Sequence, residues 1–285
     1  MALFDAPAQE VQFQARRAER EAGPWVQRLA RLGYAAKGVV YIIIGGLAAQ
    51  AAFSPAEDIE GSQGAMASIL RQPHGKVLLG IVALGLAGYV LWRAVQAIRD
   101  PEHKGGGLKG TATRIGYAIS AVLHAGLTLE AVRLLRGGAG GGGGNGAQHW
   151  TAMVMEKPFG RIAVGVAGAG ILAFGIYELV KAYRGADLDK RLALQGSGVA
   201  TRRRVVALAR AGMAARGVVF GIIGWLVIQA ARQFEAAQAQ GLQGALVTLR
   251  QQSYGAYLLG AVALGLIAYG LFQLVKARFR VIRAT

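Results

Sequence analysis

A few ionisable side chains interrupt long apolar stretches of this sequence, and any chemistry inside those stretches would depend on them. Arg93, His124, Glu130 and Glu178 are the main examples. Charged groups are costly in hydrocarbon, so those that occur there usually carry function or pair with one another. A histidine can relay protons, and an arginine can pair with a carboxylate. We therefore treat these four residues as candidate polar positions within a membrane.

The sequence offers little for metal binding or covalent catalysis. It has no cysteine and only 4 histidines, whereas a zinc site needs three or four protein ligands placed together. No Walker, HExxH or nucleophile-elbow pattern is present. We therefore expect no catalytic residue, no metal site and no cofactor, and we predict that the protein is not an enzyme.

The composition indicates that most of the chain is surrounded by lipid. Of its 285 residues, 54% are hydrophobic and 16% are charged, and 43 are glycine. Soluble domains carry about 25% charged residues. The net charge of +17 comes from basic residues at the ends of apolar runs, as the positive-inside rule predicts for a membrane protein. This placement argues against a nucleic-acid partner and for the lipid bilayer, including its anionic headgroups.

Six apolar runs are long enough to cross about 30 Å of hydrocarbon as helices. They cover residues 32–53, 75–98, 113–135, 159–183, 205–231 and 255–278. The sequence therefore predicts an all-α, polytopic membrane protein with six transmembrane helices.

The chain repeats itself three times. Residues 31–38 open the first run with an Arg-x-Gly pattern that returns at 114–121 and 210–217. The second run of each repeat has glycine at five-residue steps, at Gly80, Gly85, Gly165, Gly170, Gly260 and Gly265. Five residues turn a helix by about 140° from one glycine to the next. We therefore predict that neighbours pack closely against the second helices on several sides.

The repeats define the predicted domains. After a cytoplasmic or interfacial segment at 1–29, three two-helix units cover 30–100, 110–184 and 204–280. Each unit crosses the membrane twice, so all three enter from the same side, which predicts parallel repeats in a pseudo-threefold arrangement. A glycine-rich stretch at 137–146 predicts a flexible loop within the second repeat.

Lysine and arginine are concentrated before the first run, after the second and fourth runs, and at the C-terminal end. Glu57, Asp58 and Glu60 fall on the opposite side. The positive-inside rule then predicts that both termini lie in the cytoplasm.

The pattern Arg-x-Gly-Tyr-x-x-Lys-Gly at 31–38, with Gln-Pro-x-Gly-Lys at 72–76 before a glycine-rich helix, resembles the bacterial membrane family catalogued as domain of unknown function 1206. The resemblance covers about residues 28–280. Repeat 2 departs most from it, with Ser120 at the basic position and His124 at an aromatic one. The resemblance implies a multi-pass protein of the bacterial inner membrane and no established activity.

Two basic residues occupy one repeat position near the predicted cytoplasmic side. Lys37 and Arg216 lie about a turn and a half inside their helices, and we expect them to reach the headgroups or to bind anionic lipid. A contact with a substrate is the alternative. His124 shares the position of Tyr41 and Phe220, which predicts that it faces protein. It is then either a hydrogen-bonded interior histidine or a group that binds a proton or ligand.

A third set of equivalent positions carries Arg93, Glu178 and Gln273. If this position faces the pseudo-threefold axis, the three side chains converge in a charge-paired network. The alternative is that they are interfacial charges at helix ends, as is Glu130 toward the external end of its helix.

We predict a non-enzymatic accessory or scaffold protein of the bacterial inner membrane. Its partners would be lipids or another membrane protein, reached through helix–helix or lipid contacts. The alternative is a small-solute or ion channel or transporter along the pseudo-threefold axis. A packed apolar axis would argue against this alternative.

Overall fold

The computed structural model describes residues 6–54, 58–101, 105–138, 145–185, 192 and 198–280, with only the backbone for 6–26 and 145. Apart from one isolated bridge between Leu192 and Arg280, the regular structure in these ranges is helical.

Six long helices carry the predicted spans. They are α1 (Ala6–Phe53), α3 (Gly75–Arg99), α4 (Leu108–Leu135), α6 (Gly160–Arg184), α7 (Val199–Gln233) and α9 (Gly255–Phe279). Each is long and apolar enough to cross a membrane, and the span of α1 is Gln27–Phe53. The all-α, polytopic fold with three repeats is therefore confirmed. Residues 6–26, predicted as part of a separate segment, continue α1 toward the N-terminus.

Each repeat also contains a short helix that the sequence did not reveal. These are α2 (Ser62–Leu70), α5 (Asn145–Met155) and α8 (Leu242–Arg250), with a 3-10 turn η1 (Ala236–Gln238) before the last. They are too short to span a membrane. We call their side of the bundle the short-helix end, and the side where the span of α1 begins the terminal end. Of the glycine-rich loop predicted at 137–146, residues 139–144 lie outside the described residues.

A tight turn joins each short helix to the next span, and it explains the recurring glycine before that span. The backbone N–H of Gly75 donates to the carbonyl of Gln72 at 2.8 Å, and Gly160 and Gly255 make the same bond in their repeats. A Cβ atom on Gly75 would overlap the carbonyl oxygen of Leu70. Only glycine fits so close an approach of backbone to backbone.

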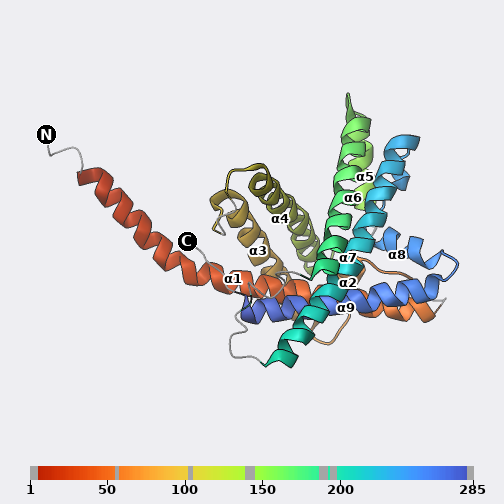
Figure 1. Cartoon of the computed structure of the whole chain (residues 1–285), viewed down its shortest axis with the longest axis horizontal. Coiled ribbons are helices and arrows are strands. Elements are labelled where there is room, and N and C mark those ends of the chain that lie inside the picture. Colours follow the sequence, from red (N-terminus) through yellow and green to blue (C-terminus); the bar gives the residue numbers. More distant parts are fainter. Residues whose placement is uncertain are drawn as a thin grey trace.

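The spans pack as three pairs, each joining the second span of one repeat to the first span of another: α1 with α9, α3 with α4, and α6 with α7. Figure 1 shows the C-terminal part of α1 beside α9, with α6 and α7 crossing them steeply. Glycines allow the closest approaches. A Cβ on Gly38 would lie 2.8 Å from the carbonyl oxygen of Gly270, and one on Gly217 would lie 2.9 Å from that of Gly175.

The recurring arginine caps the partner helix within each pair. The last carbonyls of a helix lack partners within it, and a cation there is favourable. The bonds are Arg31 Nη1 to Arg278 O at 2.7 Å, Arg114 Nε to Ala97 O at 2.8 Å, and Arg210 Nε to Ala182 O at 2.9 Å. The motif thus serves the contacts between repeats.

Contacts within repeats break the threefold pattern. The two spans pack together in repeat 1 (α1 with α3) and in repeat 3 (α7 with α9). The two spans of repeat 2, α4 and α6, do not pack against each other. Tyr89 and Tyr269 are 0% and 4% exposed, whereas their equivalent Phe174 is 41% exposed. We call the separation between α4 and α6 the seam, bordered by Gly116 and Ile119 on α4 and by Gly170, Phe174 and Tyr177 on α6.

A change of side-chain size accounts for the seam. In repeats 1 and 3 the first span presents Ala36 or Ala215, whose Cβ lies against a glycine of the second span. The equivalent residue in repeat 2 is Ile119, which is too bulky for that contact. A Cβ atom on its expected neighbour, Gly170, would have no atom of the described structure within 4 Å.

The six glycines predicted to pack differ in their surroundings. A Cβ on Gly85 or Gly265 would overlap a neighbouring alanine. One on Gly260 would lie 3.4 Å from Phe53, and one on Gly165 would lie 3.7 Å from Ala231. In the described ranges nothing lies within 4 Å of such an atom at Gly80 or Gly170. The tight contacts therefore belong to the glycines between the spans of repeats 1 and 3.

Because of the seam, we expect alanine to have different effects at the equivalent glycines Gly33 and Gly116. A Cβ on Gly33 would lie 2.6 Å from the Cβ of Tyr89, whereas one on Gly116 would meet nothing within 4 Å in the described structure. We expect Gly33→Ala to lower the free energy of unfolding by about 1–2 kcal/mol through overpacking, and Gly116→Ala to raise it slightly, because alanine is the better helix former. Thermal unfolding in detergent measures both. An equal loss in the two variants would mean that α4 and α6 touch, and would contradict the seam.

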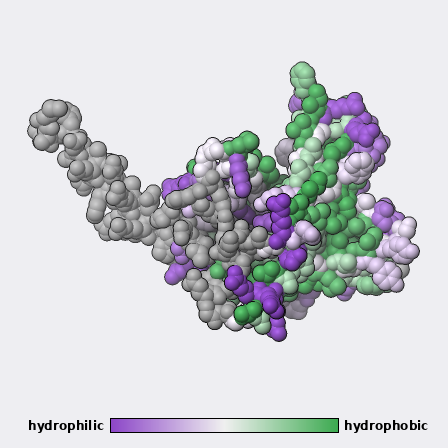
Figure 2. Space-filling view, viewed as in Figure 1, coloured by the Kyte–Doolittle hydropathy of each residue, from purple (hydrophilic) through white to green (hydrophobic). Residues whose placement is uncertain are grey.

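The interior toward the short-helix end is apolar and packed. Fully buried side chains from several spans and two short helices meet there, among them Ile44, Met66, Leu79, Leu86, Leu246, Leu259 and Leu266. The outer surface is also hydrophobic, as Figure 2 shows along α6 and α7. Such a surface is suited to contact with lipid.

Candidate functional site

The polar side chains of the spans gather in the terminal half of the interior. Lys37 and Arg216 follow the capping residues Arg31 and Arg210 by six residues, roughly 9 Å along a helix. We define the polar–aromatic cluster as Lys37, Tyr41, Tyr89, Arg93, His124, Glu178, Arg216 and Tyr269. It joins all three helix pairs.

One phenol oxygen holds two cations at the α1 and α3 side of the cluster. Lys37 Nζ donates to the hydroxyl of Tyr89 at 3.2 Å, and Arg93 Nε donates to the same oxygen at 2.8 Å. Arg93 also donates to Gln96 at 3.0 Å. Lys37, Tyr89 and Gln96 are buried. These two cations thus share one acceptor oxygen.

Aromatic rings extend the same centre toward α9. The ammonium of Lys37 lies 4.7 Å from the ring centroid of Tyr89, 5.8 Å from that of Tyr41 and 6.0 Å from that of Tyr269. The rings of Tyr41 and Tyr269 are 4.8 Å apart. Ring faces carry negative potential and attract cations, so three tyrosines stabilise this buried lysine.

A salt bridge forms the α6 and α7 side of the cluster. Arg216 Nη1 donates to Glu178 Oε2 at 2.9 Å, and the two side chains are 12% and 7% exposed. The guanidinium carbon of Arg216 lies 4.4 Å from the ring centroid of Tyr269 and 5.1 Å from that of Phe220. The Nε of Arg216 is buried and has no hydrogen-bond partner in the described structure.

His124 on α4 faces protein, as its repeat position predicts. Its Nδ1 donates to the carbonyl oxygen of Ser120 at 2.8 Å, because that oxygen can only accept. Its ring centroid is 4.6 Å from that of Tyr89. The described residues include no group of three His, Asp or Glu side chains close enough to hold a metal ion. His124 therefore lines the cluster as a hydrogen-bonded interior residue.

The predicted network among Arg93, Glu178 and Gln273 is not formed. Arg93 bonds to Tyr89, Glu178 pairs with Arg216, and Gln273 accepts from Lys276 at 2.8 Å. Each of the three equivalent residues thus has a partner of its own. Arg216 on α7, the first span of repeat 3, already pairs with Glu178 on α6. The carboxylate is therefore not paired with Arg93 or Gln273, which lie on the other two second spans.

Two of the remaining predicted residues lie inside the bundle, and a third lies where its sequence position predicts. Lys37 and Arg216 do not extend along the outside of their helices toward the headgroups, because their polar groups bond to Tyr89 and Glu178 inside the bundle. Glu130 is outside the cluster, six residues closer to the short-helix end than His124. Its Oε1 is buried without a partner among the described residues.

The tyrosines that hold the cations were not predicted from the sequence. A usable signal was present, since Tyr89 precedes Arg93 by four residues and Tyr269 precedes Gln273 by four. Residues four apart share one helix face. The face that carries the candidate polar residue therefore also carries its aromatic partner.

The cluster has more positive than negative charge. Lys37, Arg93 and Arg216 are its cations, and Glu178 is its only carboxylate. Within the six spans the sequence contains just one other acidic residue, Glu130, which lies outside the cluster. An arrangement of this kind favours an anion, because guanidinium and ammonium groups bind oxyanions through charge-assisted hydrogen bonds.

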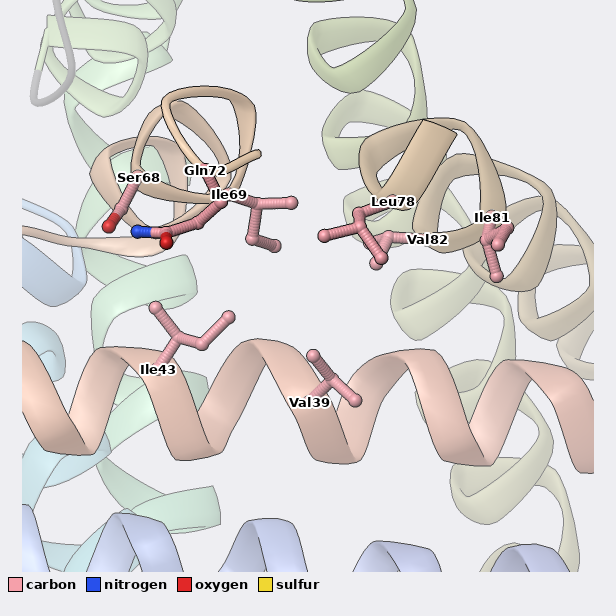
Figure 3. A pocket seen from close by; sticks show the side chains of 8 residues that line it. All are labelled: Val39, Ile43, Ser68, Ile69, Gln72, Leu78, Ile81 and Val82. Carbon is pink, nitrogen blue, oxygen red and sulfur yellow. The ribbon is translucent and has the colours of Figure 1, made fainter. Parts of the chain in front are cut away.

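Two surface grooves lie apart from the cluster residues. One, of about 380 Å³, is lined by Val39, Ile43, Ser68, Ile69, Gln72, Leu78, Ile81 and Val82 (Figure 3). Its mostly apolar lining from α1, α2 and α3 suits a lipid chain. The other, of about 340 Å³, follows the start of α7 and includes Arg202, Arg203 and Arg210.

Comparison with known proteins identifies related sequences. A family model described as Domain of Unknown Function (DUF1206) matches residues 32–100, 115–185 and 211–280. The chain is 34% identical over 267 residues to a Bacillus subtilis (strain 168) protein named "Uncharacterized protein YxxB", covering 92% of this chain and 94% of the relative. No solved structure matches. The resemblance seen in the sequence is confirmed, and neither name assigns an activity.

Proposed function

Since the chain belongs to the DUF1206 family and its repeats form a multi-pass membrane protein, we propose that it is a non-enzymatic accessory protein of the bacterial inner membrane. It acts through contacts made at the seam between α4 and α6, where a lipid or a helix of another membrane protein fits between the two spans. Nucleic acid is not among the proposed partners.

The seam is the observation that supports this proposal. Residues that repeats 1 and 3 bury between their spans are exposed in repeat 2, as Phe174 and Tyr177 are. The wall behind the seam carries the polar–aromatic cluster. A lipid-exposed surface that combines small residues, aromatic rings and access to polar groups is suited to specific contact within a membrane.

The distribution of basic residues supports an orientation with both termini in the cytoplasm. Arg202, Arg203, Arg204 and Arg210 lie at the terminal end of α7, and Lys276 and Arg278 lie near the end of α9. Positive charge of this kind favours the cytoplasmic side. The polar–aromatic cluster then lies in the cytoplasmic half of the membrane.

The packed apolar interior argues against the channel alternative. Toward the short-helix end, Ile44, Leu86 and Leu266 are buried in one cluster that joins α1, α3 and α9. Ions or polar solutes passing along the axis would have to displace these side chains, and burying a polar group among them is costly. We therefore retain the accessory function.

Photo-crosslinking in native membranes tests the proposal. A crosslinking amino acid at Ile119 or Phe174 samples the seam, and the same group at Leu84 or Leu264 samples the exposed outer surface. We expect the seam positions to yield one predominant adduct, a single lipid class or a single protein, as resolved by mass spectrometry. Equal, mixed lipid adducts at seam and outer positions would refute a specific contact at the seam.

A further inference from the structure

We infer that the polar–aromatic cluster binds the phosphate group of an anionic membrane lipid, which enters through the seam. This deepens the proposed function and rests on it, because the seam is the route by which a lipid headgroup reaches the cluster. The lipid's phosphate would lie among Lys37, Arg93 and Arg216.

The cluster carries an excess of positive charge. Three cations face one carboxylate, and Glu178 is already paired with Arg216. Lys37 and Arg93 share the phenol oxygen of Tyr89 and have no carboxylate partner in the described structure, and Arg93 bonds in addition to Gln96. Uncompensated charge is expensive within a membrane. A phosphate supplies the missing negative charge.

Lys37 and Arg216 have hydrogen-bond donors that the described structure leaves unused. Lys37 has three N–H donors and makes one hydrogen bond, to Tyr89, in the described structure. The Nε of Arg216 is buried and makes none there. Both groups lie over the ring of Tyr269, the ammonium at 6.0 Å and the guanidinium at 4.4 Å from its centroid. An oxyanion with several acceptor oxygens can satisfy donors on both residues at once.

Repeat 2 leaves a route by which a headgroup can reach the cluster. Repeat 2 has the small Ser120 where the other repeats carry Lys37 and Arg216. The span α4 that bears it stands apart from α6. The cluster, to which α4 contributes His124 and α6 contributes Glu178, is therefore approached between these two spans. Its depth of roughly 9 Å below the capping arginines is within reach of a headgroup and leaves the acyl chains in hydrocarbon.

Thermal unfolding of the full chain tests the inference. The purified protein in an uncharged maltoside detergent is titrated with phosphatidylglycerol, with phosphatidylcholine and with inorganic phosphate. A ligand that binds the folded state raises the unfolding temperature with its concentration. We expect phosphatidylglycerol to do so, and phosphatidylcholine and inorganic phosphate to have little effect at equal concentration.

Variants locate the site. Lys37→Gln retains a donor to Tyr89 but removes the charge, and we expect it to raise the half-saturating phosphatidylglycerol concentration about tenfold. Lys76→Gln removes an exposed cation at the short-helix end and should leave it unchanged. Ser120→Lys adds the basic residue of the other repeats and should lower the half-saturating phosphatidylglycerol concentration.

The other outcomes overturn the inference. Stabilisation by inorganic phosphate that Lys37→Gln abolishes would make the site one for a soluble anion. Equal phosphatidylglycerol effects in wild type and Lys37→Gln would place lipid binding elsewhere on the surface. No stabilisation by any of the three would remove the anion site. The proposed function would stand in each case if the seam crosslinks remain specific, and would fail separately if they do not.

Discussion

Glutamine in place of Glu178 should lower the free energy of unfolding by about 3–5 kcal/mol, because it leaves Arg216 as a buried cation without its counter-charge. The pair is short, 2.9 Å, and both side chains are largely shielded. Shape is not the reason for the loss, since the equivalent residue in repeat 3 is Gln273. Thermal or denaturant unfolding in uncharged detergent measures the change.

Two controls separate the ion pair from the removal of a carboxylate. Glu130→Gln makes the same chemical change on α4, where one carboxylate oxygen is buried without a partner in the described structure, and should have little effect or stabilise. The double variant Glu178→Gln with Arg216→Gln should lose less than the sum of its single changes, because the two residues are coupled. Strict additivity would show that the bond contributes nothing.

Hydropathy predicts the spans of this protein well, and the reason is physical. A bilayer admits helices of about twenty apolar residues and little else, so length and composition decide where α3, α6 and α9 lie. The repeats reinforce this, because Gly75, Gly160 and Gly255 mark the same tight turn three times. The turn can be recognised in the sequence because only glycine fits at this position.

The short helices and the seam could not be predicted in this way. The helix α2 is nine residues long, and so short an apolar segment is equally compatible with a loop or a strand. The seam depends on Ile119 standing where Ala36 and Ala215 make close contacts. Its effect is visible only once the neighbouring span is placed, since isoleucine and alanine are equally acceptable to lipid.

The ionisable residues of the cluster were predicted, but its tyrosines and its pairing were not. Ionisable residues within apolar runs are few, which is why Arg93 and Glu178 could be singled out. Repeat equivalence places them at the same depth, but which partner each one meets depends on how neighbouring helices are rotated and crossed. That rotation brings Arg216 to Glu178 and Tyr89 to Arg93.

Replacing Tyr89 by phenylalanine should lower the free energy of unfolding by about 3 kcal/mol, because Lys37 and Arg93 both lose the oxygen that accepts their hydrogen bonds. The ring itself remains to attract both cations, so the loss isolates the hydroxyl. Phenylalanine fits the position, since it differs from tyrosine only by the missing hydroxyl.

The matched control is Tyr269→Phe, the same change in repeat 3. Both rings are buried and close to a cation, but the described structure gives the hydroxyl of Tyr269 no cationic donor comparable to the two on Tyr89. Unfolding in uncharged detergent should therefore show a small loss for Tyr269→Phe and a large one for Tyr89→Phe. Equal losses would mean that ring packing, and not the shared oxygen, holds Lys37 and Arg93 in the membrane interior.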